Sequence, residues 1–266
     1  AGISVLRAAA EKNPDIHVIA LEAQPEDTYW VVGHDIGHIN SKFLKSHGVP
    51  EVDVVEFVNN WQLQSHGKSN PNLVMQFAKN SGTAVDWYLE PVAQEILDQG
   101  IITYWPDSPY AIHELNNGLK YYTGTAQWWT MEGNHNEGME LKDLTWENLR
   151  YIRENLPNAE IHFSTKGYYL LQENGAVNGV VASDGDGNYV KYTAKKVVLA
   201  AGGFGANAEM CNDLLPHIRD MRCDTDRDLG AMMDRDGSGI QMGVWAGGRL
   251  ETELSTMNFD SASGPD

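Results

Sequence analysis

Glycine and acidic residues near the start of the chain have the spacing of a dinucleotide-binding turn. Such a turn needs glycines after its first strand and an acidic side chain about 20 residues further on, which accepts hydrogen bonds from a ribose. Gly2 stands at the start of an expected helix, and Glu22 ends the strand expected after it. This is the end of the dinucleotide pattern, although one glycine and one acid at these places also occur in purely structural turns.

A second glycine-rich segment, residues 200–205, reads Ala-Ala-Gly-Gly-Phe-Gly and follows the apolar run 197–199. Because glycine has no Cβ atom, such a backbone can approach a ligand closely. A plain turn from a strand to a helix would use the same residues. The occurrence of this segment together with Gly2 and Glu22 favours a binding function.

Two groups of residues suggest metal binding without completing a site. His34 and His38 stand four positions apart and could pair as metal ligands on a helix. Gly37 weakens a helix there, and no third ligand stands at a recognisable spacing. Asp184 and Asp186 resemble the start of a calcium loop, but the ligand set stops short, so a hairpin turn is expected. We therefore expect no metal site.

Charge and composition limit the kinds of partner. The 266 residues include 19 basic and 37 acidic side chains, which is a formal charge of −18 at pH 7. This charge excludes a surface for nucleic acid or anionic membranes, whereas a helix N-terminus can hold a phosphate without Lys or Arg. No apolar run approaches the roughly 18 residues of a membrane span, so we expect a soluble chain. The two cysteines, Cys211 and Cys223, lack metal-ligand spacing and are expected to be ordinary thiols.

The elements that must position these residues alternate at first between helix and strand. Residues 1–12 predict a helix that ends in a turn, and the apolar run 16–22 predicts a buried parallel strand. A helix followed by such a strand belongs to a βαβ unit, whose first strand is expected before Ala1. Further helices are expected within 29–50, over 51–65, over 72–99 with a break at Glu90 and Pro91, and over 145–156.

The second half of the chain predicts strands followed by two helices. The tryptophan-rich stretch before it, from Trp105 to Trp129, has no clean period and is expected to supply core packing. Turns are expected at Asn174-Gly175 and at 184–187. Strands are expected over 161–164, 168–172, 177–182, 189–192 and 196–200, and helices from about Asn207 and over 238–246.

Six segments in this order resemble the FAD-binding domain of the fumarate reductase and succinate dehydrogenase flavoprotein family. The likeness spans nearly the whole chain and is closest to soluble bacterial single-chain enzymes that reduce fumarate, urocanate and related enoates. Its most specific part is 200–204, where the family has Ala-Thr-Gly-Gly followed by Phe or Tyr. The segments are residues 1–2, Glu22, and residues 37–40, 164–167, 197–204 and 237–240.

The resemblance implies an FAD cofactor and assigns the contacts of its adenosine diphosphate half. Ala1 and Gly2 would end the glycine loop beneath the pyrophosphate. Glu22, with Ala23 beside it, would hold the ribose hydroxyls. Gly167 would contact the adenine through its backbone.

The resemblance also assigns the flavin end of the cofactor. His34 and Asp35 would occupy the family's Asn-Ser or Asn-Thr position, and Ile36, Gly37 and His38 would lie beside the flavin ring system.

A third set of residues would line the cofactor channel, and it includes departures from the family pattern. Ala201, Gly202 and Gly203 would line the channel itself. Ser238 stands where the family has the Asp of a Gly-Asp-Gly turn, so that contact would be a neutral hydroxyl. Phe259 stands where the family has a substrate-contacting histidine.

The fold class implied is α/β, a Rossmann-like FAD-binding fold with a central parallel sheet, an inserted antiparallel β-meander and a partly irregular helical region. Residues 1–266 would form one FAD-binding domain that is incomplete. The capping domain and the proton-donating Arg of the family are expected after Asp266, so no residue of this chain is assigned as a catalytic acid.

The implied reaction is hydride transfer from flavin N5 to a carbon–carbon double bond next to a carboxylate. The substrate would be a small enoate, with an unknown electron donor, no nucleic acid partner and a cytoplasmic location. One alternative is a non-catalytic FAD-binding remnant or module. Another is an NAD-binding Rossmann domain, which the β-rich region between 160 and 200 disfavours.

Overall fold

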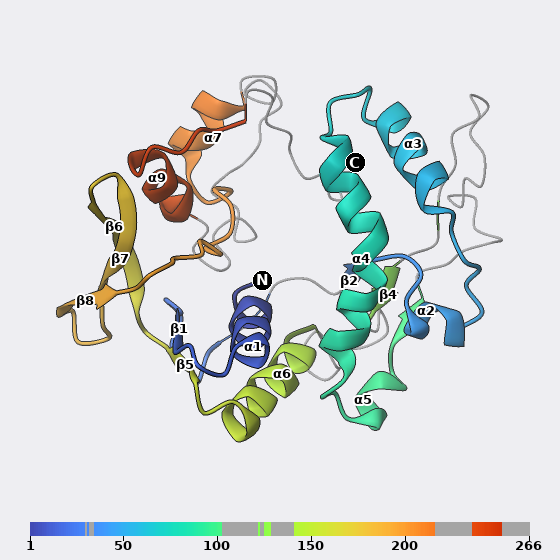
Figure 1. Ribbon diagram of the computed structural model, residues 1–266, viewed down its shortest axis with the longest axis horizontal. Helices are drawn as coiled ribbons and strands as arrows, with labels where there is room; N and C mark the ends of the chain where they lie inside the picture. The colour runs from blue at the N-terminus through green and yellow to red at the C-terminus, as the bar shows by residue number, and fades with distance from the viewer. Residues whose placement is uncertain are drawn as a thin grey trace, which may run out of the picture. The chain divides into compact units, whose positions relative to one another are not determined.

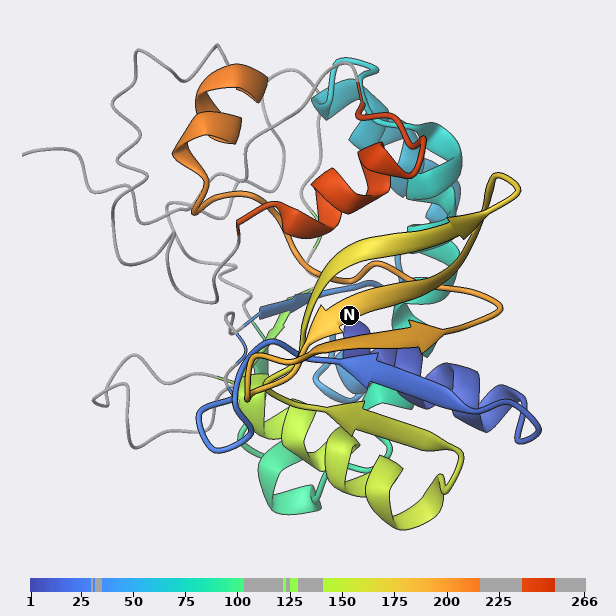
Figure 2. The same ribbon diagram turned by 90° about the vertical axis from the view of Figure 1, so that its left-hand side faces the viewer.

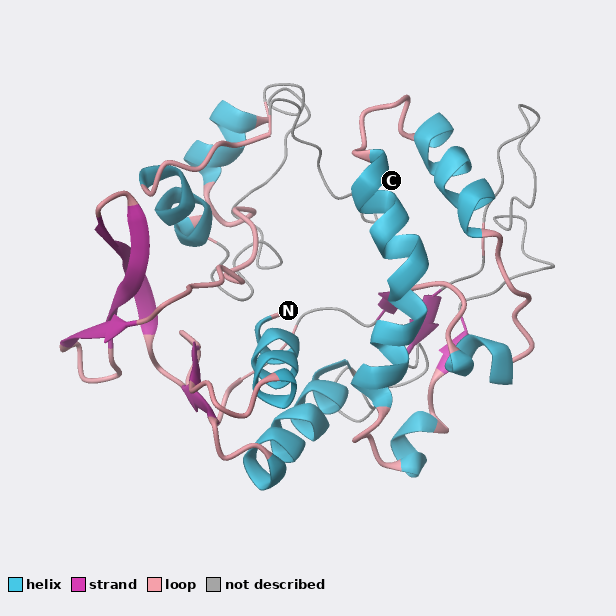
Figure 3. Ribbon diagram, in the orientation of Figure 1, coloured by secondary structure: helices cyan, strands magenta, loops and turns pink. Residues whose placement is uncertain are grey.

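A computed structural model describes residues 1–29, 31, 35–102, 122, 125–128, 141–215 and 236–251 of the protein (Figures 1 and 3). The chain divides into two units. The first contains Ala1–Gly2, Ile19–Trp30 and Ile161–Asp266, and the second contains Ile3–Val18 and Val31–Glu160.

Two short parallel strands connect the beginning of the chain with its middle. Strand β1 (Val18–Leu21) pairs with β5 (Ala159–His162). The N–H of residue 18 donates to the carbonyl of residue 158, and the N–H of residue 22 donates to the carbonyl of residue 162. Because both partners advance in the same direction, the pair is parallel, as predicted for residues 16–22. The predicted burial was wrong, since Ile16 and Ile19 are each 39% exposed and none of the residues of β1 is buried.

An antiparallel meander follows in the first unit (Figure 2). Strands β6 (Lys166–Glu173), β7 (Ala176–Ser183) and β8 (Tyr189–Thr193) form a sheet in that order. The predicted Asn174-Gly175 turn has φ angles of 52° and 77°, which is the left-handed conformation of a tight hairpin. The predicted meander is therefore confirmed.

The strand predicted over residues 196–200 is absent from the described structure. Val198 and Leu199 are 63% and 42% exposed, and none of the described segments pairs with this run. An apolar pattern alone predicts a buried strand, but a strand also requires a hydrogen-bonded neighbour. The prediction is corrected to an extended segment without a ladder.

Two helices with clear capping signals form much of the second unit. The Asp53 side chain accepts the Glu56 N–H at the start of α3 (Val54–Gln64). Asn70 caps α4 (Pro71–Leu89) in the same way, with proline at the first helical position. The predicted break at 90–91 is confirmed, since α5 (Gln94–Leu97) is a separate helix.

A buried tryptophan organises the core beside these helices. Trp128 is 1% exposed, and its indole N–H donates to the Ile96 carbonyl at 2.9 Å. The predicted packing role is confirmed for Trp128, whereas Trp105 and Trp129 lie outside the described residues. The surrounding elements are β2 (Asp35–Gly37), α2 (Lys42–Ser46), β3 (Ile101–Ile102), β4 (Thr125–Gln127) and α6 (Leu141–Asn155).

Two helices near the end of the described chain confirm the last two predictions of helix. Helix α7 (Ala208–Leu214) starts after Asn207, whose side chain accepts the Met210 N–H at 3.0 Å. Helix α9 (Ser238–Trp245) lies beside β6 (Figure 2). Among the described residues, none of the helices is both long and apolar enough to cross a membrane.

Candidate functional site

The start of helix α1 (Gly2–Lys12) lies against the second glycine-rich segment of the first unit. A Cβ atom added to Gly2 would lie 3.9 Å from the Ala200 Cβ, so these distant parts of the sequence are in contact. Ala1 is exposed, and the first turn of α1 contains no acidic residue. The unpaired N–H groups of a helix N-terminus attract anions, and here no nearby carboxylate of that turn opposes them.

Glu22 organises the chain at the end of β1. Its carboxylate Oε1 accepts the Gln24 N–H at 2.9 Å, and its backbone carbonyl accepts the Thr165 N–H at 2.8 Å. The first bond shapes the turn that contains the exposed Ala23, and the second connects Glu22 to the residues just before Gly167. An ionised carboxylate only accepts hydrogen bonds, which suits it to ribose hydroxyls.

The segment Ala201–Gly203 lies against the start of α9. A Cβ atom at Gly239 would lie only 2.7 Å from the Ala201 Cβ, so the helix can approach this closely only with glycine at that position. A Cβ atom at Gly203 would meet nothing within 4 Å, which leaves that side of the backbone open. Residues 199–202 and α9 also line a hollow of about 310 Å³.

Ser238 and Gly167 belong to the same part of the first unit. The N–H of Ser238, the first residue of α9, donates to the Asp236 Oδ1 at 2.9 Å. A Cβ atom at Gly167 would lie 3.5 Å from the Val180 Cγ1 and 3.9 Å from the Met242 Cε. The first unit therefore brings the predicted adenosine and channel residues onto neighbouring segments.

The residues predicted for the flavin end belong to the second unit. Asp35, Ile36 and Gly37 form β2, which pairs antiparallel with β4 through Ile36 opposite Ala126. His34 lies outside the described residues, as does the side chain of Asp35.

His38 is buried inside the second unit, 1% exposed, and both of its ring nitrogens are hydrogen-bonded. Its Nδ1 lies 2.8 Å from the Ile36 carbonyl, and its Nε2 lies 2.9 Å from the Ser41 Oγ. The Ser41 Oγ also accepts the Leu44 N–H, so this hydroxyl connects the ring to the start of α2. Burial lowers the pKa of His38, outweighing the opposing effects of the Ile36 carbonyl and Asp86. The imidazole connects β2 to α2 and offers no free nitrogen to a ligand.

Asp236 and Lys166 form an ion pair that sequence reasoning missed. The Lys166 Nζ lies 2.9 Å from the Asp236 Oδ2. Burial would raise the pKa of Asp236, but hydrogen bonds from Ser238 and Lys166 outweigh it and lower the pKa from 3.8 to about 2. The N-cap position of α9 is occupied by Gly237, so no helix-capping signal indicated Asp236. Lys166 carried no such signal.

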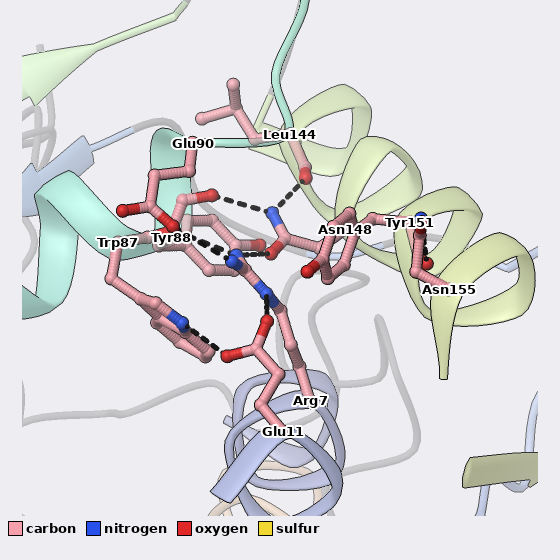
Figure 4. Close-up of polar contacts among 9 residues, drawn as sticks. All are labelled: Arg7, Glu11, Trp87, Tyr88, Glu90, Leu144, Asn148, Tyr151 and Asn155. Atoms are coloured by element: carbon pink, nitrogen blue, oxygen red, sulfur yellow. Dashed lines mark hydrogen bonds and ion pairs between the residues drawn. The ribbon is translucent and has the colours of Figure 1, made fainter. Parts of the chain in front are cut away.

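Arg7 is the second feature that the sequence did not reveal (Figure 4). Its side chain is 1% exposed, and its Nε donates to the Glu11 Oε1 at 2.8 Å. Its Nη1 donates to the Trp87 carbonyl at 2.8 Å and to the Asn148 Oδ1 at 3.0 Å, and its Nη2 lies 3.3 Å from the Glu90 Oε2. The guanidinium thereby connects α1, α4 and α6.

Aromatic rings complete the surroundings of Arg7. Its Cζ lies 4.1 Å from the centre of the Trp87 ring and 4.6 Å from that of the Tyr151 ring. The indole N–H of Trp87 donates to the Glu11 Oε2 at 2.8 Å. Burial would raise the pKa of Glu11, but the bonds from Trp87 and Arg7 lower it. The buried cation is thus paired and bonded, as a charge in a protein interior must be.

Comparison with known proteins identifies the family of this chain. The family described as FAD binding domain matches residues 9–259. This match confirms the predicted fold class, the predicted cofactor FAD and the resemblance to the fumarate reductase and succinate dehydrogenase flavoproteins. The cytoplasmic location expected from the sequence stays a prediction.

Three relatives illustrate the similarity. The urocanate reductase of Eggerthella lenta is 36% identical over 105 residues, which cover 39% of this chain and 16% of that enzyme. The open conformation of a flavocytochrome c3 fumarate reductase has a TM-score of 0.64 at 20% identity, covering 92% of this chain and 39% of that one. A 3-ketosteroid-Δ4-(5α)-dehydrogenase from Rhodococcus jostii RHA1 has a TM-score of 0.66 at 17% identity, covering 92% of this chain and 51% of that enzyme. The chain therefore spans about half or less of the length of each relative.

Proposed function

Because this chain belongs to the family of FAD binding domains, we propose that it holds the cofactor of an oxidoreductase that reduces, or forms, a carbon–carbon double bond next to a carboxylate. The observation that carries the proposal is the contact between the start of α1 and Ala200, with Glu22 at the end of the neighbouring strand. The similarity to a urocanate reductase supports an enoate as the substrate class.

Residues of the first unit would bind the adenosine diphosphate half of FAD. The N–H groups at Ala1 and Gly2 would hold the diphosphate at the start of α1, as helix N-termini bind phosphates elsewhere. This suits a chain with a charge of −18, because it needs no basic patch. The Glu22 carboxylate would accept the ribose hydroxyls, and the backbone of Gly167 would contact the adenine.

The remaining predicted residues would orient the other half of the cofactor. Ala201, Gly202 and Gly203 would line its channel, where the open side of Gly203 leaves room for a ligand. The backbone of β2, from Asp35 to Gly37, would lie beside the flavin together with His34 and the backbone of His38, whose side chain is buried. We also assign both units, residues 1–266, to one FAD-binding domain. When bound, FAD supplies the hydride chemistry, and this chain supplies binding and orientation.

Anaerobic mixing tests the proposed reaction with the protein expressed at its full length and loaded with FAD. The flavin is first reduced with light or dithionite, and urocanate, fumarate or a saturated dicarboxylate is then added. The proposal predicts that an unsaturated acid reoxidises the flavin and that the saturated acid does not. Retention of FAD without reoxidation by any enoate would instead support a non-catalytic FAD-binding module.

A further inference from the structure

Asp236 connects three segments of the first unit. Its Oδ2 lies 2.9 Å from the Nζ of Lys166, the first residue of β6. Its Oδ1 accepts the N–H of Ser238, the first residue of α9, at 2.9 Å. Its backbone carbonyl accepts the Nδ2 of Asn207, the cap of α7, at 2.8 Å.

The turn that follows Asp236 is fixed against the predicted channel segment. The Gly237 N–H donates to the Gly203 carbonyl at 3.1 Å. Gly237 has a φ of 76°, and a Cβ atom there would collide with the Met210 sulfur and with the Phe204 Cβ. Glycine is therefore required on both conformational and steric grounds. The turn therefore holds Asp236 next to the segment that contains Gly203.

Lys166 extends the same connection to the residues predicted to contact adenosine. Gly167 follows it directly, and the preceding residue, Thr165, is buried and donates its N–H to the Glu22 carbonyl at 2.8 Å. A continuous path therefore runs from Glu22 through residues 165–167 to Asp236. The ion pair between Lys166 and Asp236 joins the start of β6 to the turn before α9.

We propose that Lys166 and Asp236 are positioning residues for the adenosine half of FAD. Their ion pair sets the distance between Gly167 at the entry of β6 and Gly203 beside the turn. This inference rests on the proposed function. The pair itself does not contact the cofactor; it fixes the two backbone segments that do.

The charges of the pair also matter to an anionic ligand. Lys166 and Asp236 neutralise one another, and their side chains are 32% and 35% exposed. Loss of Lys166 would leave an uncompensated carboxylate in the unit that receives the diphosphate, in a chain that already carries a charge of −18. Loss of the Asp236 carboxylate would remove this partner of Lys166 and the charged acceptor of the Ser238 N–H.

Titration of the full-length apo-protein with FAD, ADP and FMN tests the proposal. ADP contains the adenosine diphosphate half, and FMN contains the flavin without adenosine. The variants are Lys166→Met, Asp236→Asn and the conservative Lys166→Arg. Lys45→Met is the matched control, because it breaks an exposed ion pair with Glu51 in the second unit, 3.4 Å long.

Lys166→Met and Asp236→Asn should each raise the Kd for FAD and for ADP about fivefold, the size expected for a partly exposed pair. The Kd for FMN should stay unchanged, and Lys166→Arg should bind almost as the wild type does. Lys45→Met should alter none of the three. The double variant should resemble the single ones, since both remove the same contact.

Three results would overturn the inference. Unchanged FAD and ADP binding in both variants would show that the pair does not position the cofactor. Equal weakening of FAD and FMN would indicate general destabilisation, which the melting temperatures of the apo-proteins would also reveal. A wild-type protein that binds no FAD would overturn the proposed function and this inference with it, whereas normal wild-type binding with unaffected variants would overturn the inference alone.

Discussion

Two regions of the molecule contain ion pairs that differ in burial. One surrounds Arg7, and the other is the pair formed by Lys166 and Asp236. Arg7 is 1% exposed, and each of its nitrogens is bonded to a partner (Figure 4). Lys166 and Asp236 are each about one third exposed. A buried charge must be fully paired to be tolerated, whereas an exposed pair gains little in water. We therefore expect the contacts of Arg7 to stabilise the second unit, and the Lys166–Asp236 pair to adjust the geometry of the segments proposed to bind FAD.

The largest effect is expected from Arg7→Met. Methionine would leave the Asn148 Oδ1 and the Trp87 carbonyl without their charged donor, so unfolding should become easier by about 3–5 kcal/mol. Arg150→Met is the matched control, because Arg150 is 51% exposed and pairs with Glu147 and Glu154 on the surface of one helix. Urea unfolding should show a large fall in midpoint for the first variant and a small one for the second. Equal falls would contradict the contrast between buried and exposed charges.

A smaller effect is expected where α9 approaches the channel segment. Gly239→Ala would place a Cβ atom 2.7 Å from the Ala201 Cβ, and relieving this overlap should cost about 1–3 kcal/mol. Gly243→Ala on the same helix is the control, since its new Cβ would lie 3.4 Å from the end of the Leu199 side chain. Thermal unfolding and FAD titration should both detect the first change. Tolerance of alanine at both glycines would show that the close approach is not required.

The smallest effect concerns pH and the buried His38. Burial lowers its pKa below 6.5, so the folded state disfavours the protonated ring. The contribution of the neutral His38 ring to the free energy of unfolding should be fully present above pH 6.5. It should fall as the pH drops from 6.5 towards the lower pKa of His38 in the folded protein. His38→Asn, which keeps a donor near Nδ1, should lose less stability than the wild type over this range. Identical pH profiles would mean that groups other than His38 determine the response.

Local sequence signals predicted much of the fold. Residues 1–12 and 16–22 were identified because their apolar periodicity depends only on neighbouring residues. Pro91 likewise marked the end of α4, since proline removes a backbone donor. The turns at the glycine segments could also be predicted, because their backbone conformation restricts which residues can occupy them.

Contacts between residues far apart in the sequence could not be predicted from local patterns. The run 196–200 has the composition of a strand, yet strand formation depends on a hydrogen-bonded partner elsewhere in the chain. Arg7 looks like an ordinary polar residue on a helix until α4 and α6 surround it. Lys166 and Asp236 stand 70 positions apart, so only the fold reveals that they meet.

The central claim is that the start of α1, Glu22 and the segment Ala201–Gly203 hold FAD. Calorimetric titration of the full-length apo-protein with FAD tests it most directly, with Glu22→Gln beside the exposed Glu26→Gln as control. The account predicts about one FAD per chain for the wild type and the control. It predicts about tenfold weaker binding for Glu22→Gln, because a charged acceptor of hydrogen bonds is lost. Equal FAD affinity in all three proteins, or no binding by the wild type, would contradict the account.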